Sequence, residues 1–513
     1  MTVSRSARVG MAICAVLALA ACSVPGVGGP QTRTTSVPPQ TPPPGMAGLE
    51  KFYQQTLTWK DCNSGDQCTQ LQVPLDYDAP SSTVVTLAVI KAPATGSSQG
   101  AILYNPGGPG GSAVDFVAAA ADRVLNAGVR RNYDLIGMDP RGVGHSDPIE
   151  CLDDKGLDAF LAQDPTPDSP AEEQDFAANS KSFASSCKTN AGPLLAHVST
   201  EDAAKDMDIL RAAIGEPKLN YLGASYGTFL GATYADLFPQ LVGRFVLDGA
   251  VPPDLTNEQI NLGQAKGFEQ ATRAWAADCV SSGTCPLGTS VDQVVQGLQD
   301  LLVQIDQNPP TNTGDSTVPA LTEGWASMGV AVAMYDQGMW GQLDDALSSL
   351  VSSGDASGLM DLANAYAERD PDGTYANNIM QVIYAVNCLD RPDTASLSDH
   401  QRQAAEAAKV APTWGKFLMW SSLPCAFWPY QGDNPPHPIA ATGSDLIVVV
   451  GTTRDPATPY EWAVRLNEQL ANSTLVTFDG DGHTAYGRSN SCVDRAIDDY
   501  FTKGTAPAPD LRC

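Results

Sequence analysis

The chain has 513 residues, and 58 acidic against 30 basic side chains give it a formal net charge of −28 at pH 7. This charge argues against nucleic acid as a partner, because binding phosphates needs a basic face. It also argues against electrostatic docking on anionic lipid. The length of the chain is sufficient for a large core and for two or three domains.

The N-terminus has the pattern of an export signal. Residues 1–22 carry a short basic region and an apolar run that is too short to span a bilayer. The run ends Leu-Ala-Ala-Cys, which resembles a bacterial lipobox with Cys22 as the acylated residue. Residues 23–48 are rich in Pro, Gly, Thr and Gln and predict an extended linker. We therefore expect an exported cell-envelope protein, lipid-anchored to the outer face of the cell membrane, although an ordinary signal site with an incidental cysteine is the alternative.

The cysteines agree with export. Of the twelve, Cys14 belongs to the signal and Cys22 to the lipid site, and an even number of ten remains. An even number outside the cell indicates a disulfide framework. Sequence does not fix the connectivity, and pairing of neighbours is the hypothesis: Cys62 with Cys68, Cys151 with Cys187, Cys279 with Cys285, Cys388 with Cys425, and Cys492 with Cys513. No C-x-x-C occurs and the five histidines lie far apart, so we expect no metal site.

The first half of the folded chain alternates between strand and helix patterns. Apolar or alternating runs predict strands at 71–77, 83–92, 101–105, 133–138, 218–222 and 244–248. Helical spacing predicts helices at 200–214 and 226–237. Repetition of strand, loop and helix indicates a mostly parallel sheet with helices on both faces.

The pattern then becomes helical and later returns to strands. Helices are predicted at 266–280, 291–306, 325–335, 343–350, 359–368, 376–387 and 399–409. Strands return at 445–450 and 474–478, with helices at 460–470 and 492–501. We predict a helical cap at 253–425, inserted between a first core segment at 49–252 and a second at 426–513. A cap of this kind can exclude water and select substrates by shape.

The sequence Gly223-Ala-Ser-Tyr-Gly227 contains G-x-S-x-G, which is typical of a nucleophile elbow. In an elbow a serine sits on a sharp turn between a strand and a helix. Small residues are needed two positions to either side, because the two elements approach closely there. A predicted strand precedes this pattern and a predicted helix follows it, so we predict Ser225 to be a nucleophile.

A serine nucleophile needs a base, usually histidine, and a carboxylate that orients the base. In α/β-hydrolases the order along the chain is serine, acid, histidine, each in a loop after a strand. Two histidines follow the predicted cap. His437 lies among prolines before a strand, whereas His483 follows the last core strand in a Gly-rich loop. We therefore predict His483 as the base.

Asp455 is the predicted acid, because it ends the returning strand 28 residues before the histidine. Asp248 also ends a strand and is the alternative. Asp479 and Asp481 are too near the histidine to come from a separate loop. Thr458 could bond the Asp455 carboxylate or cap the next helix.

A glycine-rich loop, Asn105-Pro-Gly-Gly-Pro-Gly-Gly-Ser, follows a predicted strand. Exposed backbone N–H groups here could bind phosphate, but the G-K-[ST] ending of a phosphate loop is missing. The other use is an oxyanion hole, with Gly108 (next to Gly107) and Tyr226 as the donors.

A second loop, Asp139 to Ser146, follows another strand. We expect it to be structural, with Asp139 and Arg141 bracing the sheet edge. A catalytic role for His145 is the less favoured alternative.

These motifs together resemble the α/β-hydrolase peptidases of the prolyl-iminopeptidase type. The Cys62/Cys68 opening, the long cap and the cysteine-bearing C-terminal part resemble the actinobacterial tripeptidyl-aminopeptidase branch and the related serine proteases of the mycobacterial cell envelope. The resemblance implies an α/β-hydrolase fold with Ser225 as nucleophile, Asp455 as acid, His483 as base and Thr458 supporting the acid loop. One departure is Pro106, where the iminopeptidase loop has histidine.

We therefore expect a serine hydrolase without metal or cofactor that cleaves a peptide or protein substrate and has esterase activity. A carboxylesterase or lipase is the alternative, and a non-catalytic envelope binding protein is the third possibility. An aminopeptidase needs a carboxylate for the substrate ammonium. The candidates for that group are Glu323, Asp336 and Asp390.

Overall fold

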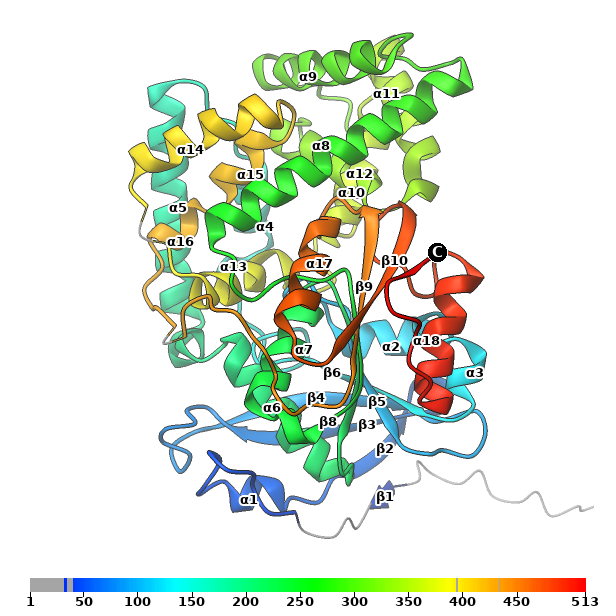
Figure 1. Cartoon of the computed structure of the whole chain (residues 1–513). Coiled ribbons are helices and arrows are strands. Elements are labelled where there is room, and N and C mark those ends of the chain that lie inside the picture. The colour runs from blue at the N-terminus through cyan, green and yellow to red at the C-terminus, as the bar shows by residue number, and fades with distance from the viewer. Residues whose placement is uncertain (1–31, 35–39, 394, 433) are drawn as a thin grey trace, which may run out of the picture.

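An eleven-stranded sheet runs through the protein, in the order β1-β2-β3-β4-β6-β5-β7-β8-β9-β10-β11 (Figure 1). The computed structural model describes residues 32–34, 40–393, 395–432 and 434–513. The strands are β1 (Thr32–Thr34), β2 (Thr58–Cys62), β3 (Asp66–Pro74), β4 (Val84–Ala92), β5 (Ala101–Asn105), β6 (Asp134–Met138), β7 (Leu219–Ala224), β8 (Val242–Asp248), β9 (Ile447–Arg454), β10 (Ser473–Asp481) and β11 (Leu511–Arg512). Pairs are antiparallel from β1 to β6 and parallel from β6 to β11.

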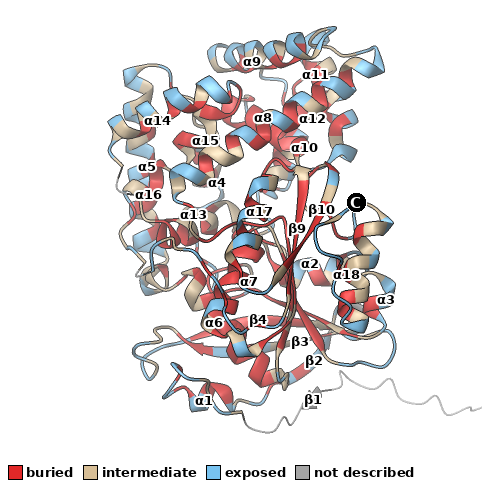
Figure 2. Ribbon diagram, in the orientation of Figure 1, coloured by how far each residue is buried: buried red, intermediate tan, exposed pale blue. Residues whose placement is uncertain are grey.

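The parallel strands are buried on both faces because helices cover each side. Leu222 and Val246 contribute to one hydrophobic core, and their neighbours Tyr221 and Phe245 contribute to the other. The first core is closed by α2 (Ala113–Val124), α3 (Ala127–Arg130) and α18 (Ser491–Lys503). The second is closed by α6 (Thr200–Ile214), α7 (Tyr226–Leu237) and α17 (Tyr460–Gln469), while α1 (Glu50–Tyr53) packs near β3. Figure 2 shows these central strands buried along most of their length.

A helical cap stands over the carboxyl ends of the central strands (Figure 1). Its main part lies between β8 and β9, as the sequence predicts. Its helices are α8 (Asn257–Ser282), α9 (Val291–Gln307), α10 (Glu323–Met334), α11 (Trp340–Ser353), α12 (Ser357–Ala367), α13 (Ile379–Asp390), α14 (Leu397–Val410), α15 (Gly415–Ser421) and α16 (Leu423–Ala426). The fold prediction, an α/β-hydrolase with a large inserted cap, is confirmed.

Two helices before α6 also belong to the cap, although the sequence places all of residues 49–252 in the core. They are α4 (Asp154–Leu161) and α5 (Pro170–Asn190), and α5 packs against α16. Stacked Phe160 and Phe183 rings, 4.5 Å apart, both meet the Tyr384 ring of α13 edge-on. The cap is therefore built from two insertions. The one that contains α4 and α5 could not be predicted as part of the cap, because α5 has no strong helical periodicity.

The N-terminal part also differs from the prediction. Thr32–Thr34 pairs with β2 although it lies in the predicted linker. A short edge strand is held by backbone hydrogen bonds and does not require an apolar pattern, so the composition of this segment could not predict the strand. Within the described residues, no helix combines the length and apolar character that a membrane span needs. Cys22 and the predicted signal lie outside the described residues.

Candidate active site

Ser225 stands on the turn between β7 and α7 in a strained backbone geometry, with φ 55° and ψ −124°. Positive φ is uncommon for a residue with a Cβ and marks sites where surrounding structure holds it. A Cβ on Gly223 would lie 2.4 Å from the Gly227 oxygen, and one on Gly227 would lie 2.7 Å from the Asn105 oxygen. The two glycines are therefore required by close packing, and they leave the serine projecting from the end of the sheet.

His483 and Asp455 come together from the loops after β10 and β9. The His483 Nδ1 atom lies 2.9 and 3.0 Å from the two Asp455 oxygens. The carboxylate also accepts the Ala457 and Thr458 amides at 3.0 and 2.8 Å and the Thr484 amide at 3.2 Å. Because the carboxylate is an acceptor, Nδ1 carries the imidazole proton and Nε2 is left free for a proton from a nucleophile.

The sequence allows Thr458 either to bond the Asp455 carboxylate or to cap the next helix, and the structure shows the first. Its hydroxyl donates to Asp455 Oδ2 at 2.9 Å and lies 3.3 Å from His483 Nδ1. The helix that follows has Pro459 at its N-cap, without a capping side chain. Thr458 therefore holds the acid and does not cap the helix.

Asp248, the alternative acid, contacts the backbone beyond the histidine. Its carboxylate accepts the Ala485 amide at 3.0 Å and the Tyr486 amide at 2.8 Å. Burial raises the pKa of Asp248 to about 6. This aspartate therefore fastens the loop that carries His483, and it makes no hydrogen bond to that ring in the described structure.

His437, Asp479 and Asp481 are held by contacts outside the histidine–aspartate pair. His437 is half-buried, with Nε2 at 3.9 Å from Asp236. Asp479 and Asp481 both pair with Arg454, at 3.0 and 2.7 Å.

Ser225 and His483 both lie next to the backbone at residues 248–249. The Ser225 amide donates to the backbone carbonyl of Asp248 at 2.9 Å. A Cβ on the next residue, Gly249, would lie 3.2 Å from His483 Cε1. Among the described residues no side-chain hydrogen bond joins Ser225 to His483. Catalytic hydrogen bonds are often long in a substrate-free enzyme and tighten when substrate binds.

The glycine loop passes directly beside the nucleophile. A Cβ on Gly107 would lie 2.9 Å from Ser225 Cβ and 3.1 Å from the Tyr226 nitrogen. Gly108 and Tyr226 line the same cavity as Ser225. Within the described part of the chain, neither of their amides donates a hydrogen bond, so both are available to an oxygen of a ligand.

The Asp139 loop makes structural contacts, and its Asp139 and Arg141 side chains each bind other segments and not each other. Asp139 accepts the Ser112 hydroxyl at 2.9 Å and so anchors the end of the glycine loop. Arg141 forms a bidentate ion pair with Asp206 of α6, with both contacts at 2.7 Å. The sequence missed this partner because it lies on a separate helix. His145 is exposed and contacts Asp115 at 2.8 Å, outside the cavity.

The cavity above Ser225 has a volume of about 290 Å³ and lies between the cap and the sheet. Aromatic and aliphatic side chains make most of its wall, including Phe268, Tyr366, Trp414 and Trp462. No described lining residue is Asp or Glu. Asp336 instead pairs with Arg488 at 3.0 Å on the outside.

The other two predicted carboxylates are also held elsewhere. Asp390 accepts the Thr200 amide and hydroxyl, at 2.8 and 2.5 Å. Glu323 begins α10 just behind the cavity wall, where its neighbour Gly324 is a lining residue.

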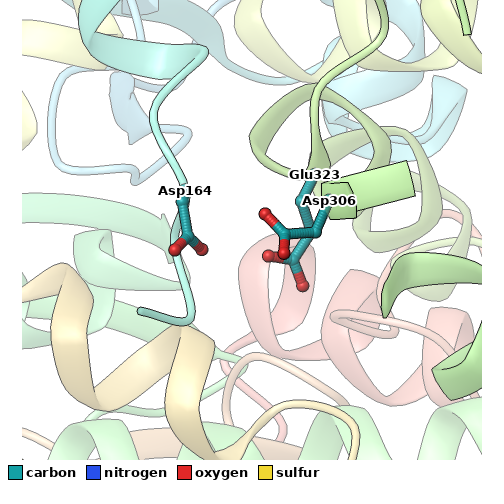
Figure 3. Close-up of side chains that lie close together, drawn as sticks. All are labelled: Asp164, Asp306 and Glu323. Atoms are coloured by element: carbon teal, nitrogen blue, oxygen red, sulfur yellow. The ribbon is translucent and has the colours of Figure 1, made fainter. Parts of the chain in front are cut away.

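Glu323 belongs to an acidic cluster with Asp164 and Asp306 (Figure 3). The three carboxylates come from different elements, and their oxygens lie within 4.8 Å of one another. Such a group of oxygen ligands could hold a hard cation. Burial, followed by the contact with Asp164, raises the pKa of Glu323 to about 8, so a proton can relieve the repulsion instead.

The raised pKa of Glu323 predicts a pH-dependent stability. Its folded pKa lies above its ordinary value of 4.5, so the stabilisation is fully present below about pH 4.5 and is lost as pH rises through about 8. We expect the melting temperature to fall between about pH 5 and pH 8, and Glu323→Gln to flatten that fall. Thermal unfolding across this range checks it, with exposed Glu406→Gln as the control. Parallel curves for Glu323→Gln and wild type would contradict the assignment.

Five disulfides join the neighbouring cysteines of the hypothesis: Cys62–Cys68, Cys151–Cys187, Cys279–Cys285, Cys388–Cys425 and Cys492–Cys513. Two of them, Cys151–Cys187 and Cys388–Cys425, join the cysteines that are farthest apart in sequence. They close loops of 36 and 37 residues and so restrict the unfolded chain strongly.

Comparison with known proteins gives consistent matches. Residues 411–513 match the family described as TAP-like protein. The chain is 40% identical over 482 residues to Serine protease Hip1 of Mycobacterium tuberculosis, covering 90% of this chain and 91% of that protein. It is 39% identical over 513 residues to Carboxylesterase B of the same species, covering 98% and 95%. It is 34% identical over 474 residues to Tripeptidyl aminopeptidase of Streptomyces lividans, covering 89% and 86%.

Proposed function

This chain belongs to the serine hydrolase family that includes Serine protease Hip1 and the tripeptidyl aminopeptidases, and on that premise we propose that it cleaves peptide bonds through an acyl-enzyme on Ser225. The observation that carries the proposal is the strained serine beside a histidine whose Nδ1 is held by a buried carboxylate. This arrangement supplies a nucleophile, a base and an orienting acid at one end of a cavity.

In the proposed reaction His483 Nε2 takes the Ser225 proton as the hydroxyl attacks the substrate carbonyl. The Gly108 and Tyr226 amides stabilise the oxyanion, and the imidazolium then protonates the leaving amine. Water repeats these steps to release the acyl group. Asp455 keeps the ring in the required tautomer throughout.

The cavity favours a peptidase that does not require a free substrate amine, because no described carboxylate lines it. We expect N-acetylated peptides to be cleaved at rates comparable to those of the free peptides. Mass spectrometry of matched free and acetylated peptides tests this, with Ser225→Ala as the blank. A strict requirement for the free amine would contradict it and would point to the acidic cluster around Glu323 as the amine site.

A carboxylesterase is the second candidate. It is favoured by the apolar and aromatic cavity wall and by the similarity to Carboxylesterase B. Peptide and ester cleavage share the acyl-enzyme, so short-chain aryl esters measured beside the peptides separate the two preferences through their kcat/KM.

We also propose that the enzyme is exported and tethered through an acylated Cys22, a proposal supported by the lipobox-like sequence. Cys22→Ser is expected to move the protein from the membrane fraction to the soluble fraction and to abolish incorporation of labelled palmitate. Cys14→Ser, in the apolar part of the signal, is the matched control. Unchanged labelling in Cys22→Ser would contradict the anchor.

A further inference from the structure

Arg391 is a buried cation in the wall of the active-site cavity. It follows α13, its exposed fraction is 4%, and it lines the cavity that also contains Ser225. Among the described lining residues it is the one side chain that carries a formal charge at neutral pH. The charge is therefore placed in surroundings that are otherwise mostly aromatic and aliphatic.

One end of the buried Arg391 guanidinium has no hydrogen-bond acceptor among the described residues. Its Nε donates to the Leu255 oxygen at 3.1 Å, and the buried Nη2 has no acceptor among the described residues. The adjacent carboxylate, Asp390, accepts from Thr200 and forms no ion pair with Arg391 in the described structure, although its charge partly opposes the lowering of the Arg391 pKa by burial. A buried donor without an acceptor costs free energy. Such a group in a native protein needs an explanation.

Arg391 is also held in place beside the elbow helix. Its guanidinium carbon lies 4.5 Å from the centre of the Phe229 ring, and Phe229 follows Ser225 by one turn of α7. The Phe229 and Tyr226 rings lie 6.1 Å apart. The Asn257 amide donates to the Arg391 carbonyl at 2.6 Å. The cation is therefore fixed near the reacting end of the cavity.

We propose that Arg391 binds a carboxylate of the substrate and so sets a preference for acidic substrates. The proposal rests on the proposed function, because it assigns a specificity group to the same cavity. Arginine presents planar donors that match a carboxylate, and a charge-assisted bond in a site with little water is strong. An acidic side chain and the C-terminal carboxylate of a short peptide offer the same chemistry. A substrate ammonium placed at this position would instead meet a like charge.

The test uses alanine tetrapeptides in which one residue is replaced by Asp or by Asn, each with a free or an amidated C-terminus. We expect wild type to prefer the carboxylate member of at least one matched pair in kcat/KM by about 10- to 100-fold. An Asp-over-Asn preference identifies a side chain as the source, and an acid-over-amide preference identifies the C-terminus. Arg391→Met is expected to remove the preference, so that kcat/KM for each carboxylate peptide falls toward the value for its neutral partner.

Two further variants separate specificity from structure. Arg391→Lys keeps the positive charge but loses the planar pair of guanidinium donors, so it should retain part of the preference. Arg465→Met removes an arginine that pairs with Asp254 outside the cavity and should retain all of it. Binding of the same peptides to Ser225→Ala, measured by calorimetry, repeats the comparison without turnover.

Equal kcat/KM for every matched pair in wild type would overturn the proposal. An Arg391→Met variant that loses acidic and neutral peptides equally, with a lowered melting temperature, would also overturn it and would make Arg391 a structural residue. Both results leave the proposed function intact as long as hydrolysis depends on Ser225. Loss of that dependence is the separate result that rejects the proposed function.

Discussion

Ser225→Ala is expected to lower peptide and ester hydrolysis by at least about 10⁴-fold while leaving the fold intact. The hydroxyl is the atom that forms the acyl-enzyme, whereas the cavity and the oxyanion donors remain. The Ser225 side chain makes no hydrogen bond that its removal would break in the described structure. Steady-state rates, a burst of product in wild type and covalent labelling by a serine-directed phosphonate all measure this effect.

Ser421→Ala is the matched control, because Ser421 lines the same cavity and bonds its own helix backbone at Leu418. It should keep most of the activity and the full extent of labelling. Activity that survives in purified Ser225→Ala, or a label found on another residue, would reject the proposed nucleophile.

Asp455→Asn is expected to reduce kcat by about 10³- to 10⁴-fold, because an amide in place of the carboxylate favours the wrong tautomer of His483. Asp248→Asn is the informative comparison, since both aspartates are buried and end neighbouring strands. Asp248 binds the Ala485 and Tyr486 amides, so its loss should lower the melting temperature more than it lowers kcat. Rates measured below the melting transition of each variant separate the two effects.

The opposite ranking would reassign the acid. If Asp248→Asn lost as much kcat as Asp455→Asn with an unchanged melting temperature, Asp248 would be the orienting carboxylate. Thr458→Val, which removes one donor to Asp455, should fall between Asp455→Asn and wild type.

The core and the candidate triad could be predicted because their signals are local. A strand followed by a glycine-framed serine, an aspartate at a strand end and a histidine after the last strand each follow from short stretches of sequence. Their order along the chain matches one known fold. The family membership predicted from these motifs is confirmed by the relatives at 34 to 40% identity.

The remaining features depend on contacts between distant segments. Arg141 pairs with Asp206, which no local pattern indicates. The α4–α5 insertion joins the cap through aromatic packing with α13. The sequence gives no sign that Arg391 is buried, because an Asp-Arg pair is typical of a solvent-exposed helix end. Its burial is a property of the assembled cap and sheet.

Tyr335 joins the cap to the loop of the proposed base. Its carbonyl accepts the His483 amide at 2.9 Å, and its ring meets the imidazole edge-on at 5.4 Å. A wide swing of this end of α10 would break that bond and release the histidine from its position. Opening of the cap at this end of α10 is therefore coupled to the position of the proposed base. If the cap stays closed during catalysis, we expect a narrow chain to reach the cavity more readily than the body of a folded protein.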